Sequence, residues 1–280
     1  MSKYLVLQTD FGLQDGAVSS MYGVAYGVSD EITVSDLTHG ITPFNIFEGS
    51  FRLSQTVKYW EPGTVFVSVV DPGVGSKRLS IVAKLKSGHY VVTPDNGTLT
   101  HLAANYGIEA VRVLDETTQR LPGSEESSTF HGRDIYAYNG ARLASGQVTF
   151  EELGTALDPN AIVQLPLNLP VVEDGAIEGN VDITDVNFGS LWSNISLEAF
   201  KELQVQLGDL IHVEVLHKGE QRYSGYLPYV HTFDDVKPGE PLVYIDSVYT
   251  VAFGVHTGSF AQQYNVGAGE DWSVKISKVN

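Results

Sequence analysis

Residues 64–78 read TVFVSVVDPGVGSKR, an apolar run that ends in an acid, a proline and two glycines. The apolar residues of 64–70 hardly alternate with polar ones, which predicts a strand buried on both of its faces. Such strands are typical of parallel sheets that carry helices on both sides. Pro72 and Gly73 then force a turn directly after Asp71. The stretch therefore predicts an α/β fold with an acid at the sheet edge where such folds bind ligands.

The sequence on either side of this strand alternates between strand and helix patterns. Short runs rich in β-formers predict strands at 4–11, 32–37, 80–86, 90–94 and 111–114. Helical patterns lie at about 15–28, 46–60 and 133–145. We expect a largely parallel sheet flanked by helices, with the loops TDFG, SDLTHG and VVDPGVG gathered at one edge.

The pattern of the sequence changes near residue 170. The stretch VQLPLNLPVVEDG (163–175) carries two prolines, and after it come short strand-like runs separated by Gly, Pro and Asp turns. Only LEAFKEL (197–203) has a helical pattern there. We predict an N-terminal α/β domain of residues 1–168 and a smaller C-terminal β-barrel or sandwich of residues 169–280.

The composition excludes several classes of function. The 280 residues include 17 Lys and Arg against 34 Asp and Glu, a formal net charge of -17. A surface this acidic repels nucleic acids and anionic membranes, so we expect neither as a partner. The absence of cysteine excludes thiol nucleophiles, disulfides and Cys-based zinc sites and suits a cytoplasmic location. No run approaches the roughly 20 apolar residues of a membrane span.

The segment QTDFGLQDGA (8–17) places Asp10 at the end of the first predicted strand. A kinase DFG motif is excluded because no glycine-rich loop, strand lysine or HRD loop precedes it. A nucleoside-hydrolase calcium site needs a denser group of acids than Gln8 and Asp15 provide. Two hypotheses remain open. Asp10 either accepts hydrogen bonds from a ribose cis-diol or caps the helix that follows.

Other strand-end loops supply further polar groups. Asp71 and Arg78 are close enough in sequence to form an ion pair across a returning loop. The segment TFHGRD sets His131 just ahead of a predicted helix, with Gly132 giving access to it. The turn TPDNGTL adds Asn96, for which helix capping and ligand binding are equally plausible. In the second domain, DVNFGSLWSNI combines Asp185 with aromatic side chains suited to stacking on a base.

Taken in order, several motifs resemble those of the S-adenosyl-L-methionine hydrolases, also called SAM hydroxide adenosyltransferases, which are kin to the fluorinating and chlorinating adenosyl enzymes. These motifs are TDFGxxDG, ITPFNIFEGSF, EPGTVFVSVVDPGVGSKR, VTPDNG, FHGRDIYA and FGSLWSNI. The resemblance runs from about Tyr4 to Asp271. It implies that water cleaves S-adenosyl-L-methionine (SAM) into adenosine and methionine without a cofactor or metal. It also implies a homotrimer with active sites between subunits.

The resemblance implies roles for particular residues. The family's catalytic Asp-Arg-His set falls on Asp71, Arg78 and His131, and its ribose-binding acid falls on Asp10. The other implied substrate contacts are Phe44 beside the sugar, Asn96, Asp185 at the methionine end, Ser190, Trp192 and Phe233 around adenine, and Ser247 at the amino-acid end. Two departures matter, because Ser190 stands where many relatives have Asn and DSVYTVAF replaces a more glycine-rich run.

Three rival functions stay open at this point. Halide transfer on the same scaffold is disfavoured because the halogenating relatives carry a Ser next to the position of Gly132 and an extra loop that this chain lacks. A non-catalytic adenosine or SAM binding protein would not need Asp71, Arg78 and His131, all of which are present. A metal-dependent nucleoside hydrolase would release adenine rather than adenosine.

Overall fold

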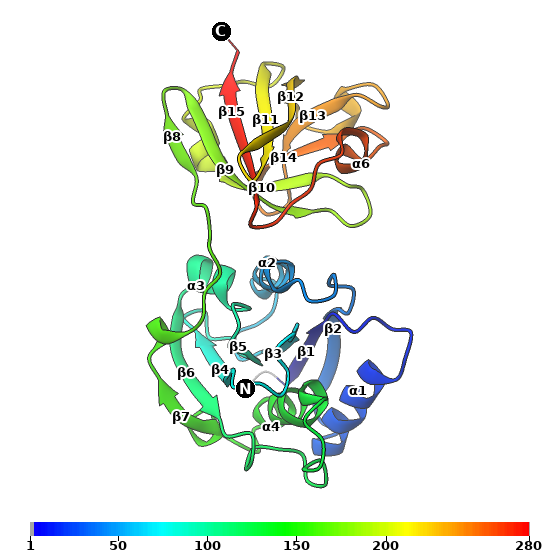
Figure 1. Cartoon of the computed structure of the whole chain (residues 1–280), viewed down its shortest axis with the longest axis vertical. Helices are drawn as coiled ribbons and strands as arrows, with labels where there is room; N and C mark the ends of the chain where they lie inside the picture. The colour runs from blue at the N-terminus through cyan, green and yellow to red at the C-terminus, as the bar shows by residue number, and fades with distance from the viewer. Residues whose placement is uncertain (1–2, 280) are drawn as a thin grey trace. The chain divides into compact units, whose positions relative to one another are not determined.

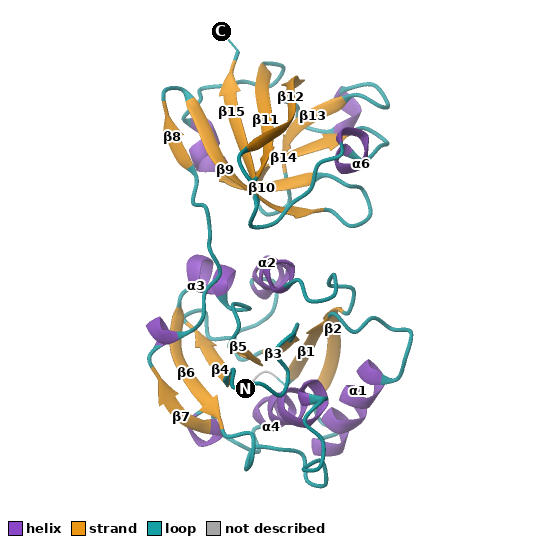
Figure 2. Ribbon diagram, in the orientation of Figure 1, coloured by secondary structure: helices purple, strands orange, loops and turns teal. Residues whose placement is uncertain are grey.

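The computed structural model describes residues 3–279, and the chain divides between Leu165 and Pro166 into two compact units. The division lies inside the proline-containing stretch 163–175. Figure 1 shows the course of the chain, and Figure 2 shows that the N-terminal unit mixes helices and strands whereas the C-terminal unit consists mainly of strands. The predicted α/β fold with a β-rich C-terminal part is therefore confirmed.

The N-terminal unit is built on one seven-stranded sheet with the strand order β2-β1-β3-β5-β4-β6-β7. Its strands are β1 (Tyr4–Thr9), β2 (Thr33–Thr38), β3 (Val65–Val69), β4 (Ser80–Leu85), β5 (Tyr90–Pro94), β6 (Ile108–Leu114) and β7 (Gly154–Leu157). The pairs β1–β2, β1–β3 and β3–β5 are parallel, whereas β5–β4, β4–β6 and β6–β7 are antiparallel. The sheet is thus mixed, which corrects the expectation of a largely parallel one.

Helices cover both faces of this sheet, as predicted (Figure 2). They are α1 (Ala17–Val28), α2 (Ile46–Val57), α3 (Thr100–Tyr106), the π-helix η1 (Gly132–Ala137) and α4 (Tyr138–Ser145), with short 3₁₀ turns η2 (Glu151–Leu153) and η3 (Pro159–Ala161). Helix α2 begins where the Asn45 side chain accepts a hydrogen bond from the Glu48 backbone N–H. The single helix predicted at 133–145 is a π-helix that continues into α4.

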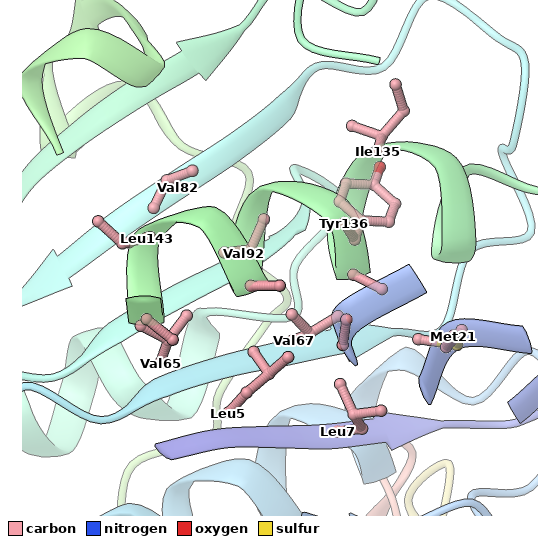
Figure 3. Packing of buried hydrophobic residues seen from close by; sticks show 14 of the residues in the cluster. Leu5, Leu7, Met21, Val65, Val67, Val82, Val92, Ile135, Tyr136 and Leu143 are labelled. Atoms are coloured by element: carbon pink, nitrogen blue, oxygen red, sulfur yellow. The ribbon is translucent and has the colours of Figure 1, made fainter. Parts of the chain in front are cut away.

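The alternation of side chains along β1 builds two apolar layers. Leu5 and Leu7 pack with Met21 of α1 and with residues of η1 and α4 (Figure 3). Val6 faces the opposite side, where it packs with Leu53 of α2 and with α3. Because successive strand residues point to opposite faces, an unbroken apolar run is what a strand between two helical layers requires. The two layers hold the strand ends, and the loops that follow them, in fixed positions.

The C-terminal unit is an antiparallel, nearly closed barrel with the strand order β12-β11-β15-β9-β10-β14-β13, and β8 pairs with β9. Its elements are β8 (Val171–Glu173), β9 (Ala176–Thr184), β10 (Leu191–Ser196), α5 (Leu197–Lys201), β11 (Leu210–His217), β12 (Glu220–Pro228), η4 (Phe233–Asp235), β13 (Pro241–Ile245), β14 (Thr250–Val255), α6 (Phe260–Tyr264) and β15 (Trp272–Lys278). A bridge between Tyr229 and Val243 brings the two ends of the sheet together.

Candidate functional site

Polar side chains gather at one edge of the N-terminal sheet. Strands β1, β3 and β5 are parallel and end there, so the residues that follow them, Asp10, Asp71 and Asn96, lie along the same edge. Strand β4 runs in the opposite direction and begins at this edge, which brings Arg78 there just before its first residue. Strand β6 is antiparallel to β4 and therefore ends at this edge too, two residues before Glu116.

Asp71 and Arg78 form the predicted ion pair. Nη2 of Arg78 lies 2.7 Å from Oδ2 of Asp71, and Nε lies 3.1 Å from both carboxylate oxygens. Both side chains are almost wholly buried, with exposed fractions of 9% and 4%. Burial opposes the charge of Arg78, but hydrogen bonds to Asp71 and Glu116 outweigh it and raise the pKa of the guanidinium. Arg78 is therefore a permanent buried cation.

His131 joins this pair from the residue that precedes the π-helix η1. Its Nδ1 lies 2.9 Å from Nη2 of Arg78, and its side chain is 1% exposed. Burial lowers the pKa of the imidazole, and the charges of Arg78 and Arg120 lower it further, against an opposing effect of Glu116. The structure thus brings Asp71, Arg78 and His131 together, with the buried imidazole against the guanidinium.

Two further residues complete the hydrogen bonds of Arg78. Its Nη1 donates to Oε1 of Glu116 at 2.6 Å and to Oγ of Ser80 at 3.0 Å. Together with Asp71 and His131, these acceptors engage all five N–H groups of the guanidinium. Glu116 was not among the predicted site residues, although the acidic pair that follows the predicted strand 111–114 was a signal for it. The site therefore holds two carboxylates against Arg78, not one.

The hydroxyl of Tyr136 lies beneath this cluster. It is 2.8 Å from Oγ of Ser80, which in turn lies 2.6 Å from Oε1 of Glu116. The Tyr136 side chain is fully buried, and burial raises the pKa of the phenol. Figure 3 shows Tyr136 in the apolar layer beside Ile135. The phenol is therefore a neutral partner that anchors Ser80 below Arg78.

Asp10 and Phe44 lie together at the end of β1. Oδ2 of Asp10 accepts a hydrogen bond from the backbone N–H of Phe44 at 2.8 Å. Helix α1 begins only at Ala17, after the N-cap residue Gly16, and the Ala17 N–H donates to Asp15 rather than to Asp10, so the alternative of Asp10 as the N-cap is wrong. Phe44 has a φ of 68°, and 70% of its surface is exposed. Asp10 thus fixes a strained loop that presents an aromatic ring to solvent.

A buried relay supports the turn next to Asp10. Oγ1 of Thr9 lies 2.8 Å from Nδ1 of His39, and Nε2 of His39 lies 2.8 Å from Oδ1 of Asp36. The hydroxyl of Tyr22 donates to the same oxygen of Asp36 at 2.8 Å. The carbonyl of His39 also accepts the backbone N–H of Gly12 at 2.8 Å. The His39 side chain therefore connects the ends of β1 and β2.

Asn96 and Gly132 have structural partners in this unit. The Asn96 amide donates to the carbonyl of Val70, directly before Asp71, and its Oδ1 accepts from the hydroxyl of Thr98. Gly132 is buried against aromatic rings, and a Cβ atom there would lie 3.0 Å from Phe11. Gly132 thus allows close packing and is not an open entrance to His131, which corrects our expectation of access.

The predicted residues of the C-terminal unit lie on β10, in η4 and in loops. The carboxylate of Asp185 accepts the backbone N–H groups of Asn187 and Phe188, each at 2.9 Å, and so closes a tight turn. The backbone N–H of Asp185 donates to the carbonyl of Ser190. Ser247 is exposed in a separate turn that follows β13. The structure does not link Ser247 by a hydrogen bond to the other predicted residues.

Ser190, Trp192 and Phe233 gather around Tyr244 and Gly254. The Phe233 and Tyr244 rings lie 4.8 Å apart between centroids. A Cβ atom at Gly254 would lie 2.7 Å from the Phe233 ring and 3.1 Å from Oγ of Ser190. Burial raises the pKa of Tyr244, and the neighbouring Ser190 and Trp192 side chains partly offset this effect. Trp192 and Phe233, the two aromatic residues predicted to contact adenine, thus both lie near Tyr244. The absence of a side chain at Gly254 leaves space for the Phe233 ring.

The described part of the chain contains neither a candidate group of metal ligands nor a helix that could span a membrane. Among residues 3–279, no three His, Asp or Glu side chains are grouped so as to hold a metal ion. None of the helices in that range is long and apolar enough to cross a bilayer. What the N-terminal edge offers is a buried, charge-balanced set of fixed donors and acceptors, which suits the orientation of a small polar reactant.

Comparison with known proteins gives consistent matches. Residues 5–154 match the model of the SAM hydroxide adenosyltransferase N-terminal domain, and residues 179–273 match that of the C-terminal domain. The (R)-S-adenosyl-L-methionine hydrolase of Salinispora tropica is 37% identical over 268 residues, 95% of each chain. A fluorinase of Actinoplanes is 28% identical over 290 residues, again 95% of each chain.

A solved structure shares the fold. The crystal structure of an uncharacterized conserved protein from Thermotoga maritima is 33% identical to this chain and covers 98% of it and 99% of its own length. The TM-score is 0.88, so the same arrangement of strands and helices recurs throughout.

Proposed function

The chain belongs to the SAM hydroxide adenosyltransferase family, and from this premise we propose that it is an enzyme that hydrolyses S-adenosyl-L-methionine to adenosine and L-methionine. The observation that carries the proposal is the convergence of Asp71, Arg78 and His131 on one buried site. The similarity to the hydrolase of Salinispora tropica also supports the proposal, because the alignment covers nearly the whole length of both chains.

The reaction we propose is an in-line displacement. A water oxygen forms a bond to C5′ of the substrate while the C5′–S bond breaks, and the electron pair of that bond stays on sulfur as the thioether of methionine. The water loses one proton as adenosine forms, and this proton is released to solvent with the products. Because the sulfonium is already an excellent leaving group, the enzyme needs no general acid. Positioning one water behind C5′, away from bulk solvent, supplies most of the rate enhancement.

In this proposal the charged cluster forms the wall beside the attacking water. An isolated arginine would repel a sulfonium cation, but Arg78 is paired with Asp71 and Glu116. Arg120 adds a second positive charge near His131, so two guanidiniums balance two carboxylates while the imidazole stays neutral. Such a balanced site tolerates a cationic substrate and still stabilises hydroxide character on the nucleophile.

His131 is either the base for the water or the residue that orients the site. The geometry favours orientation, because Nδ1 faces Arg78 at 2.9 Å and accepts its N–H. A nitrogen engaged in this way takes up a water proton only after Arg78 moves. We therefore propose that His131 fixes the guanidinium and that the carboxylates around Arg78 direct the water.

The substrate contacts are proposed residue by residue. Asp10 accepts from the ribose hydroxyls, because one carboxylate can accept from both members of a cis-diol, and Phe44 lines the sugar. We propose that the remaining contacts come from Asn96, Asp185, Ser190, Trp192, Phe233 and Ser247. As the resemblance to the family implies, we propose a homotrimer in which each active site lies between subunits.

We further propose that the enzyme works in the cytoplasm without a cofactor, a metal or nucleic acid. The absence of cysteine suits the cytoplasm, and the net charge of -17 disfavours nucleic acid as a partner. Treatment with EDTA tests the metal directly, and we expect unchanged activity. A loss of activity that added Mg²⁺ or Ca²⁺ restores would contradict the proposal.

Halide transfer is the second candidate, because a fluorinase aligns with almost the whole chain. Incubation with SAM and either fluoride or chloride separates the two reactions. Hydrolysis gives adenosine whatever the halide concentration. A 5′-halogenated nucleoside whose yield rises with halide would favour the second candidate.

A further inference from the structure

The imidazole of His131 lies between two guanidinium groups. Nη2 of Arg78 is 2.9 Å from Nδ1, and Nη2 of Arg120 is 3.3 Å from Nε2. A guanidinium only donates hydrogen bonds, whereas an imidazolium has no acceptor and a neutral imidazole has one. A proton on both ring nitrogens would therefore point an N–H at a cation on each side.

These contacts select one tautomer of the neutral ring. The shorter distance is to Arg78, so Nδ1 carries the lone pair and Nε2 carries the proton. The opposite tautomer would direct the Nδ1 proton against Arg78. Oε1 of Glu116 lies 3.6 Å from Nδ1, which is too far to accept that proton in a hydrogen bond. In this tautomer Nη2 of Arg120 and Nε2 of His131 are both hydrogen-bond donors. Other contacts must therefore hold Arg120 in place next to the ring.

The loop that contains Arg120 supplies these contacts through its backbone carbonyl groups. Its Nε donates to the carbonyl of Glu116 at 3.2 Å, and its Nη1 donates to the carbonyls of Ser124 at 3.3 Å and Ser127 at 3.0 Å. The guanidinium is therefore tied to three backbone groups between β6 and η1. These bonds leave Nη2 directed at His131.

We propose that Arg120 is a positioning residue of this site, which holds the His131 imidazole neutral and directs its Nδ1 at Arg78. The charged groups that face the ring are Arg78 and Asp71 from the loop after β3 and Glu116 and Arg120 from the loop after β6. Asp71 and Glu116 favour the protonated ring, and the two arginines oppose it. The role of Arg120 in catalysis rests on the proposed function, whereas its effect on the protonation of His131 does not.

A matched control exists on helix α4. Arg142 also holds the loop after β6, because its Nη1 donates to Oε1 of Gln119 at 2.7 Å, but it has no contact with His131 in the described structure. Arg142→Gln therefore loosens the loop while leaving the charge beside Nε2 in place. Arg120→Gln removes that charge, and Arg120→Lys keeps it while losing the planar fork.

The experiment follows the ring nitrogens of His131 by ¹⁵N NMR from about pH 5 to about pH 8, a range that spans ordinary histidine titration. The signals are assigned by their loss in His131→Gln. In the wild-type protein we expect the neutral Nε2–H tautomer at neutral pH. In Arg120→Gln the pKa of His131 rises, whereas in Arg142→Gln and Arg120→Lys it stays near the wild-type value.

Two results would overturn the proposal. One is a wild-type imidazole that is protonated or carries its proton on Nδ1 at neutral pH, which needs no variant to observe. The other is an equal pKa in Arg120→Gln and wild type, or an equal rise in Arg120→Gln and Arg142→Gln. The rate of adenosine formation is measured on the same samples, and Arg120→Gln should lose a larger factor at about pH 6 than at about pH 8. Absence of adenosine in the wild type would instead refute the proposed function and leave the NMR result standing.

Discussion

Nη2 of Arg78 donates to Nδ1 of His131 across 2.9 Å, from the same nitrogen that donates to Asp71. One guanidinium nitrogen thus bridges a buried carboxylate and a buried imidazole. The two donors of this nitrogen have fixed directions, so a shift of either acceptor displaces the other. This coupling makes Arg78 the centre of the site and determines what its replacement should do.

Arg78→Ala should abolish turnover while SAM still binds. Because Asp71 and Glu116 would lose a buried cation, we also expect unfolding to become easier by about 3–5 kcal/mol. Adenosine formation and calorimetric binding of SAM, measured on the same folded sample, test this directly. Arg222→Ala is a suitable control, because that guanidinium is exposed and paired with Glu220. Parallel losses of binding and turnover would contradict the assigned role.

Asp10→Asn should weaken SAM binding more than it slows the bound substrate. The amide oxygen still accepts the N–H of Phe44, but the charge that we assign to the ribose hydroxyls is gone. Charge-assisted hydrogen bonds contribute about 1.5–3 kcal/mol, which corresponds to a roughly 10- to 100-fold rise in Kd. Calorimetry measures Kd, and single-turnover kinetics measures the rate. An unchanged Kd with a large loss of rate would argue against ribose binding by Asp10.

His39→Ala should destabilise the fold and disturb substrate binding together. The change leaves Thr9 and Asp36 without their shared partner, at a cost of about 1–3 kcal/mol in the free energy of unfolding. Tyr22→Phe removes only the outer hydrogen bond to Asp36 and should cost less. Urea denaturation gives both values. A larger effect of Tyr22→Phe would contradict the relay.

His101 should make the protein less stable in mild acid. Its ring packs 4.7 Å from that of Phe47 between centroids, and burial lowers its pKa from 6.5 to about 4. The folded state therefore binds fewer protons than the unfolded chain between these values, so stability is lost as the pH falls from about 6.5 to about 4. The shift corresponds to about 3 kcal/mol. Urea denaturation of His101→Gln should show a smaller loss, and a loss equal to that of the wild type would refute this assignment.

Local patterns in the sequence were sufficient to predict the layers of the N-terminal unit. The run 64–70 lacks alternation because β3 lies between two helical layers, and the prediction of a buried strand is confirmed. The directions of β4, β6 and β7 were not predicted, because strand direction depends on which strands pair and not on local periodicity. The mixed sheet thus appears only in the structure.

Site residues were missed where their position depends on the folded chain and not on local sequence patterns. Asp71, Arg78 and His131 lie next to recognisable motifs, and the structure brings them together as expected. Glu116 reaches Arg78 only because β6 ends at the same edge as β3, which follows from the antiparallel pairing of β4. Arg120 lies in a loop without any periodic pattern, so no local signal pointed to it. Its contact with His131 depends on the folded course of that loop.

The most direct test of the account is to incubate the protein with SAM in H₂¹⁸O and to identify the products by liquid chromatography and mass spectrometry. We predict adenosine and methionine in equal amounts, with ¹⁸O in the 5′-hydroxyl of adenosine, and neither product above background with Arg78→Ala. Free adenine, a halogenated nucleoside, or adenosine without ¹⁸O at C5′ would contradict attack of water at that carbon.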